Sequence, residues 1–215
     1  MNQPVNMEQR ELMDLLIWIA QLGDKVQSVS AKVQKIQERT AINYRKIRDR
    51  ELEALLLSAP LGLRLLDRNV FIYLPAIEKG TCFVPILGVE YDYSLHPPEI
   101  HLKVALFLIS ENDGLETLNA IGYRFETPHE GVRHRYCHIQ HIIRFDQSER
   151  YKLPGAEWVP WEYPAFPVDA QDPIELLICM LVSLYDIDII KKLDGKTKTI
   201  FETHIQRMKL HNLNL

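Results

Sequence analysis

The chain has 215 residues, of which 47% are apolar, so it can bury a core of ordinary size and is not disordered over most of its length. Its formal net charge of −4 provides no overall attraction to nucleic acid or to an anionic membrane, so any such binding must be regional. The three cysteines, Cys82, Cys137 and Cys179, are far apart in apolar stretches, which favours reduced, buried thiols over a disulfide or zinc framework.

The N-terminus does not resemble a targeting segment. Its first sixteen residues contain acids, Glu8, Glu11 and Asp14, where a signal peptide would carry positive charge, and no apolar run of the chain reaches the length of a membrane span. We therefore expect a cytoplasmic protein that has no membrane partner.

A heptad pattern follows. Apolar residues recur at alternating spacings of three and four, at Leu12, Leu15, Ile19, Leu22, Val26, Val29, Val33 and Ile36. We call these residues the seam. One flank of the seam is basic, which favours an acidic partner helix or prevents self-pairing, at Lys25, Lys32, Arg39 and Lys46. The pattern predicts a helical arm over residues 1–60 that docks on a protein partner, either a second copy or another chain. The alternative is a helix that folds back on its own domain.

Positive charge is concentrated in residues 39–50, which we expect to lie on the same helix as it continues to Ala59. The basic side chains of this patch are Arg39, Arg45, Lys46 and Arg48. They could contact phosphates, so nucleic acid is a second candidate partner. Nearby acidic residues neutralise the patch, however, and a charged run on a helix is most often its solvated face.

From residue 69 the apolar period changes from helical to alternating. Strand-like runs separated by short turns predict an antiparallel meander over residues 69–147 within a body formed by residues 61–215. Pro85 interrupts the second run, which suggests an edge strand or a bulge. The predicted fold is α+β: a long N-terminal amphipathic, coiled-coil-like helix, then an antiparallel β-meander sheet covered by C-terminal helices.

Alternation along these strands assigns polar side chains to one face. If strands that are neighbours in sequence also pair, this face gathers Glu90, Asp92, His101, Lys103, Arg124, Glu126, His134 and His138. Carboxylates beside a lysine can hold a divalent cation in a nuclease, and paired histidines can act as acid and base in a metal-independent ribonuclease. The ordinary use of such a face is a solvated surface with cross-strand charge pairs. We expect no metal ligands, since the three nearby histidines lack a chelating spacing.

The C-terminal third begins with a segment rich in proline and aromatic residues, over residues 154–171. Its Trp158 and Trp161 either cover the sheet or form a docking surface for a protein partner. Asp172 and Pro173 are typical of a helix start and predict an almost wholly apolar core helix over residues 172–192. A last amphipathic helix is predicted over residues 197–212.

The sequence lacks a phosphate-binding glycine loop, a dinucleotide fingerprint and a paired-cysteine zinc motif, so we expect no cofactor. Its strongest signal concerns packing. We therefore predict a non-catalytic accessory or adaptor subunit of a multiprotein complex, and we hypothesise a prokaryotic machine acting on nucleic acid. The alternative is a small nuclease or ribonuclease that uses the polar face.

Overall fold

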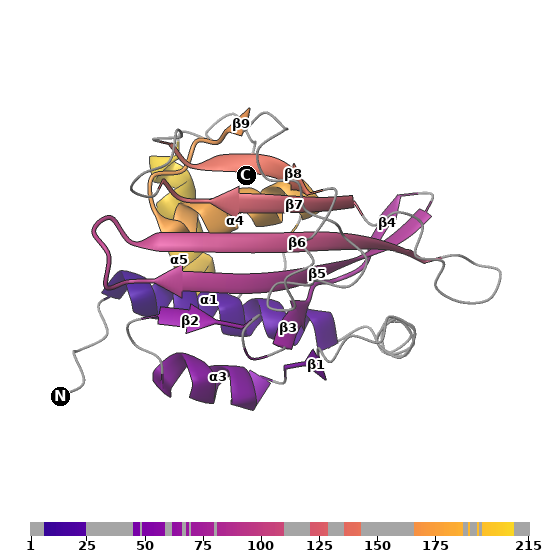
Figure 1. The fold of residues 1–215 in the computed structure, drawn as a ribbon, viewed down its shortest axis with the longest axis horizontal. Helices are drawn as coiled ribbons and strands as arrows, with labels where there is room; N and C mark the ends of the chain where they lie inside the picture. The colour runs from indigo at the N-terminus through magenta and orange to yellow at the C-terminus, as the bar shows by residue number, and fades with distance from the viewer. Residues whose placement is uncertain are drawn as a thin grey trace.

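The computed structural model describes residues 7–24, 45–47, 49–58, 62–65, 68, 70–79, 81–109, 121–128, 136–142, 166–186, 189, 193 and 195–208. Its helices are α1 (Met7–Asp24), α3 (Asp49–Ser58), α4 (Pro173–Tyr185) and α5 (Gly195–Arg207). Its strands are β1 (Arg45–Lys46), β2 (Gly62–Arg64), β3 (Val70–Tyr73), β4 (Ile77–Lys79), β5 (Thr81–Asp92), β6 (Glu99–Ile109), β7 (Ile121–Glu126), β8 (His138–Ile142) and β9 (Phe166–Pro167). The helices and the sheet together form the predicted α+β fold (Figure 1).

The sheet is built around the long hairpin of β5 and β6, which pair antiparallel from Cys82 opposite Ile109 to Asp92 opposite Glu99. Strands β7, β8 and β9 continue the sheet from β6, each antiparallel to its neighbour. The other edge of β5 is shared by β2, β3 and β4, and β1 pairs with β3 in parallel. The predicted pairing of sequence neighbours is therefore confirmed from β5 to β8. The parallel strand β1 was not predicted.

Pro85 lies neither at a sheet edge nor at a break in the strand. It sits inside β5, opposite Leu106 of β6, and its carbonyl accepts a hydrogen bond from the Leu74 backbone N–H at 3.0 Å. The missing N–H of proline faces the same side as its carbonyl, toward the short link between β3 and β4. The sequence expectation of an edge or a bulge was wrong because the neighbouring strand changes at this residue, so no ladder hydrogen bond is lost.

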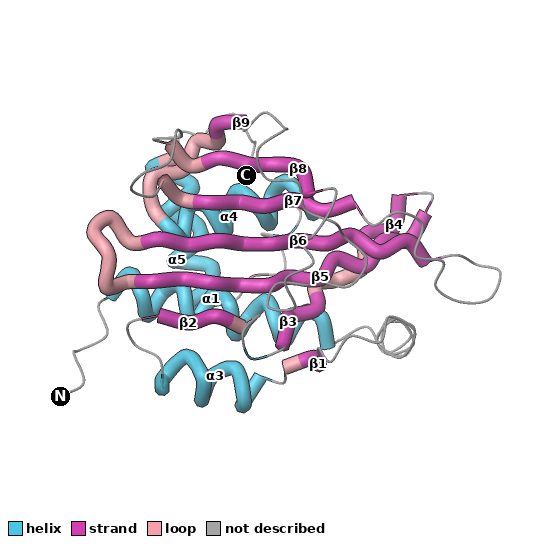
Figure 2. The backbone as a smooth tube through the Cα atoms, in the orientation of Figure 1, coloured by secondary structure: helices cyan, strands magenta, loops and turns pink. Residues whose placement is uncertain are grey.

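Helices α1, α4 and α5 cover one face of the sheet, and Figure 2 shows the strands in front of them in the same view. That face carries the alternate apolar residues Val89, Tyr91, Ile100, Leu102, Val104 and Phe125. They form one buried cluster with apolar residues of the helices, among them Leu177 and Phe201. The C-terminal helices thus cover the sheet as predicted, because alternation places every second strand residue on the apolar face.

The start of α4 is as predicted, whereas its end is earlier. The Asp172 side chain accepts a hydrogen bond from the Glu175 backbone N–H at 2.8 Å, and Pro173 occupies the first turn. The helix ends at Tyr185 rather than near residue 192, because Asp186 adopts a φ of +60° and its N–H bonds to the Val182 carbonyl. A left-handed φ of this kind cannot continue a right-handed helix.

Helix α1 is a core element of the domain. Leu12, Leu15, Ile19 and Leu22 are at most 8% exposed and pack in the same cluster as the sheet. The buried arc of α1 also includes Met13, Leu16, Trp18 and Ala20, so it is wider than a coiled-coil seam. The first half of the seam is therefore covered by its own chain, as in the alternative interpretation. Val26, Val29, Val33 and Ile36 lie outside the described residues.

The predicted continuous helix up to Ala59 is wrong. Arg45 and Lys46 form β1, opposite Val70 and Phe71 of β3, and the Ile47 N–H donates to the Phe71 carbonyl at 3.2 Å. Pairing with β3 satisfies backbone groups here and places Ile47, 1% exposed, in the core. The following helix α3 packs on α1, so what we predicted as a separate arm contributes to the common core (Figure 1).

Among the helices that are described, none combines the length and the apolar character needed to cross a membrane.

Candidate functional site

The polar face of the sheet, on the side away from α1, α4 and α5, brings most of the predicted candidates together. One row of directly opposed residues crosses five strands, in the order Arg64, Glu90, His101, Glu126 and His138. A second row consists of Lys103, Arg124 and Gln140. We call these two rows the polar rows. They exist because the apolar neighbours of these residues face the helices, and alternation then turns the polar side chains to the other face.

Glu126 is the centre of the polar rows and is only 2% exposed. Its Oε1 accepts a hydrogen bond from His101 Nδ1 at 2.7 Å and forms an ion pair with Arg124 Nε at 2.8 Å. Its Oε2 lies 3.3 Å from His138 Nε2. Three side chains from three strands therefore converge on a single buried carboxylate.

The electrostatics of Glu126 follow from these contacts. Burial alone would raise the pKa of this carboxyl group, but hydrogen bonds from His101 and His138 and the charge of Arg124 outweigh it. The net effect holds the pKa of Glu126 far below its usual range, so the group is ionised at neutral pH. A buried carboxylate of this kind is stable only while its hydrogen-bond partners and the Arg124 guanidinium stay in place.

The second row places two cations directly opposite each other. Lys103 faces Arg124 across β6 and β7, and Arg124 donates a hydrogen bond to the Gln140 side chain. Burial lowers the pKa of Lys103, while the nearby carboxylates Glu90 and Glu126 oppose that shift. Like charges at opposed positions destabilise a sheet, so the carboxylates of the first row are needed to stabilise the second.

A pocket of about 350 Å³ lies at one end of the first row. Its polar lining comprises Arg64, Glu90, Asp92, Glu99 and His101. Arg64 pairs with Glu90 at 2.5 Å, and His101 Nε2 is 4.0 Å from Glu99 Oε2. His101 thus links the buried Glu126 to the pocket, which is the arrangement by which a carboxylate orients an imidazole for acid–base work.

The other predicted residues are not part of the polar rows. Asp92 lies in the pocket wall, where its Oδ1 accepts a hydrogen bond from the Ser94 backbone N–H at 2.8 Å. His134, Trp158, Trp161, Arg39 and Arg48 lie outside the described residues. The backbone of Arg45 and Lys46 belongs to β1, so these two do not extend a basic helix face.

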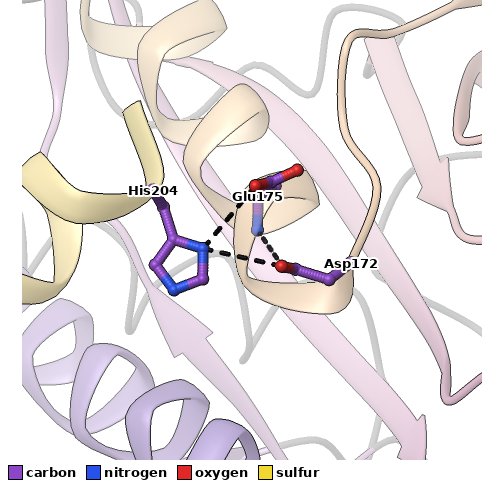
Figure 3. Close-up of side chains that lie close together, drawn as sticks. All are labelled: Asp172, Glu175 and His204. Carbon is purple, nitrogen blue, oxygen red and sulfur yellow. Dashed lines mark hydrogen bonds and ion pairs between the residues drawn. The ribbon is translucent and has the colours of Figure 1, made fainter. Parts of the chain in front are cut away.

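A second polar cluster, which sequence reasoning missed, lies on the helical side of the sheet (Figure 3). It contains Asp172 at the start of α4, Glu175 in its first turn, and His204 and Arg207 near the end of α5. Of the described residues, only Asp172, Glu175 and His204 form a group that could hold a metal ion. The capping pattern at 172–175 was visible in the sequence, but nothing local signals the approach of His204.

The structure describes the side chains of two of the three cysteines, Cys137 and Cys179. Cys137 is buried and Cys179 is partly buried, and neither forms a disulfide. Burial raises the pKa of both thiols to about 12, so thiolate is scarce at neutral pH.

The chain matches no protein-family description, no curated protein and no solved structure. Its function must therefore be inferred from its own geometry.

Proposed function

We propose that the chain is a non-catalytic adaptor subunit that binds an acidic amphipathic helix of a protein partner through the second half of its seam. The observation that carries this proposal is the continuation of the heptad pattern beyond Leu12, Leu15, Ile19 and Leu22, the four seam residues that the chain buries in its own core. This burial anchors α1 to the body. The same heptad phase continues in the sequence over Val26, Val29, Val33 and Ile36, beside the basic residues Lys25, Lys32 and Arg39.

The use of charge on the polar face also supports an adaptor. Glu126 is engaged by His101, His138 and Arg124, and Glu90 by Arg64. A network in which buried charges are neutralised by one another stabilises a fold and a specific surface. It leaves Glu126, whose two oxygens are both engaged, poorly placed to abstract a proton from a substrate.

A pair of matched substitutions tests the adaptor proposal. Val29→Asp places a charge in the second half of the seam and should abolish assembly while the thermal unfolding midpoint stays unchanged. Leu15→Asp places the same charge in the first half, at a fully buried position, and should unfold the chain. Deletion of residues 1–66 is unsuitable as a test, because it would remove α1 from the core.

Assembly is measured in two steps. Light scattering of the full chain reports self-association, and affinity purification from the native cell with quantitative mass spectrometry reports partners. The proposal requires an assembly with a stoichiometric protein partner that the wild type forms and Val29→Asp loses, and self-association through the seam would instead contradict an acidic partner helix. If folded Val29→Asp forms the same assemblies as the wild type, the seam is not the docking surface.

A second candidate function is acid–base catalysis at the pocket, favoured by the hydrogen bond of His101 to the buried Glu126. It ranks second because the pocket lining holds three carboxylates, Glu90, Asp92 and Glu99, against one guanidinium, a charge that opposes a phosphodiester backbone. Incubation of the wild type and His101→Gln with single-stranded RNA and DNA tests it. Hydrolysis that the wild type performs and the variant loses would support a nuclease, whereas absence of hydrolysis by the wild type contradicts it.

A further inference from the structure

The polar cluster on the helical side contains three ligand-type atoms that face one another. His204 Nδ1 lies 3.6 Å from Asp172 Oδ2 and 3.8 Å from Glu175 Oε1, and Figure 3 shows the three side chains converging from α5 and from the start of α4. In a tetrahedral zinc site with bonds of 2.0–2.1 Å, neighbouring ligand atoms are about 3.4 Å apart. The two spacings from His204 Nδ1 are within about 0.4 Å of this value, and all three ligand atoms lie within 4.8 Å of one another.

Each of these three side chains is oriented by a further contact. Asp172 uses Oδ1 to accept from the Glu175 backbone N–H, and Glu175 uses Oε2 to accept from the Gln171 backbone N–H, both at 2.8 Å. His204 Nε2 lies 3.4 Å from Glu11 Oε2 of α1. A carboxylate on the far nitrogen is the usual second-shell partner of a metal-binding histidine, since it places the lone pair on the other nitrogen.

The point where the ligand atoms meet is already a cation site. Arg207 Nη2 lies 2.5 Å from His204 Nδ1 and 3.1 Å from Asp172 Oδ2, and Arg207 Nε lies 3.4 Å from Glu175 Oε1. Three electron-pair acceptors that converge in this way repel one another unless positive charge lies between them. The Arg207 side chain is 55% exposed, so it can leave the cluster without disturbing the core.

The cluster has more negative charge than Arg207 neutralises. Glu11 Oε2 of α1 lies 3.4 Å from His204 Nε2, and Glu8 of the same helix is close enough to Asp172 and Glu175 to interact with them electrostatically. The Glu8 side chain is partly buried, and its Oε1 makes no hydrogen bond with the residues that are described. A buried oxygen that has no partner indicates that another polar group or ion belongs beside it.

We propose that Asp172, Glu175 and His204 bind a divalent transition-metal ion, which takes the place of the Arg207 guanidinium. One imidazole and two carboxylates suit zinc and its neighbours in the first transition row better than magnesium, which prefers an all-oxygen set. The ion joins the end of α5 to the start of α4, with Glu11 of α1 behind the histidine. Its role is to hold the three helices together, independently of the polar face and of the seam.

The test uses the full chain, treated with EDTA and then titrated with Zn²⁺ by calorimetry, with the thermal unfolding midpoint as a second measurement. The wild type should bind one ion, and its midpoint should rise with zinc. Arg207→Met removes the competing cation and should bind zinc more tightly. Asp172→Asn with Glu175→Gln keeps both capping hydrogen bonds, because Asn and Gln also serve in these positions, but should bind at least about tenfold more weakly.

Glu202→Gln is the matched control, because Glu202 is an exposed acid of α5 that pairs with Lys198 outside the cluster. It should leave both the affinity and the zinc-induced midpoint shift unchanged. The proposal is overturned if the wild type binds no zinc, or if the Asp172→Asn, Glu175→Gln variant binds as tightly as the wild type, since the ion then sits elsewhere. An affinity that does not increase in Arg207→Met also overturns it.

Discussion

Glu126→Gln is the substitution that most directly tests the role of the polar rows. The change preserves the shape of the side chain but removes the charge that His101, His138 and Arg124 contact at 2.7, 3.3 and 2.8 Å. Breaking a buried ion pair by neutralising one partner costs about 3 to 5 kcal/mol, because the remaining charges stay buried without compensation. We expect a loss of this size in the free energy of unfolding at pH 7.

The effect should depend on pH in a defined direction. The pKa of Glu126 is lower in the folded chain than the unfolded value of about 4.3, so its ionisation stabilises the fold above that pH. This stabilisation is lost as the pH falls below about 4.3 toward the folded pKa. The difference in the free energy of unfolding between the wild type and Glu126→Gln should therefore become smaller below pH 4.

Urea unfolding followed by circular dichroism, at pH 7 and at pH 3.5, measures both effects. Glu90→Gln is the matched control in the same row, because its partner Arg64 is 51% exposed and such a pair contributes only about 0 to 1 kcal/mol. The reasoning is refuted if Glu126→Gln loses no more stability than Glu90→Gln at pH 7. The reasoning is also refuted if the stability difference between Glu126→Gln and the wild type is the same at pH 3.5 as at pH 7.

Three further predictions concern the helical side. Glu8→Gln should raise the melting temperature at pH 7, because the raised pKa of Glu8 makes ionisation of this carboxyl group unfavourable in the folded chain. The gain should vanish below about pH 4.3, where the carboxyl group is protonated in the folded and in the unfolded chain. Equal melting temperatures of the wild type and the variant at pH 7 would contradict this. Cys137 and Cys179, whose pKa values are about 12, should react with a thiol reagent far more slowly in the native than in the urea-unfolded chain, as absorbance of the released thiolate would show. In metal-free buffer, Asp172→Ala should lower the free energy of unfolding by about 0.5 to 2 kcal/mol through loss of the α4 cap, whereas Asp172→Asn should lower it much less. Equal losses for the two variants in urea unfolding would rule out the cap as the cause.

The polar rows were largely predictable because strand alternation is local. A residue's parity along β5, β6, β7 or β8 assigns its face, and short turns pair these strands in sequence order. Glu90, His101, Glu126 and His138 could thus be placed on one face from the sequence. The convergence of three partners on Glu126 depends on the register of each strand pair, which no single strand encodes.

The residues of the N-terminal seam do not reveal what covers them, a partner helix or the chain's own core. A period that alternates three and four places Leu12, Leu15, Ile19 and Leu22 on one stripe of a helix, whatever covers that stripe. The burial of Met13, Leu16 and Trp18 as well shows that a sheet and three helices surround α1 rather than one partner helix. That arrangement is set by contacts between segments far apart in the chain.

Local sequence is enough to predict the fold class, the faces of the central strands and the start of α4 at Asp172, since each depends on periodicity or on a capping residue within a few positions. Contacts between distant segments were needed to show that Arg45 and Lys46 pair with β3, that α1 belongs to the core, and that His204 approaches Asp172 and Glu175. The physical reason is the same in each case. Hydrogen bonds and burial between distant segments outweigh the local helical preference, and the local sequence does not indicate which distant segments will meet.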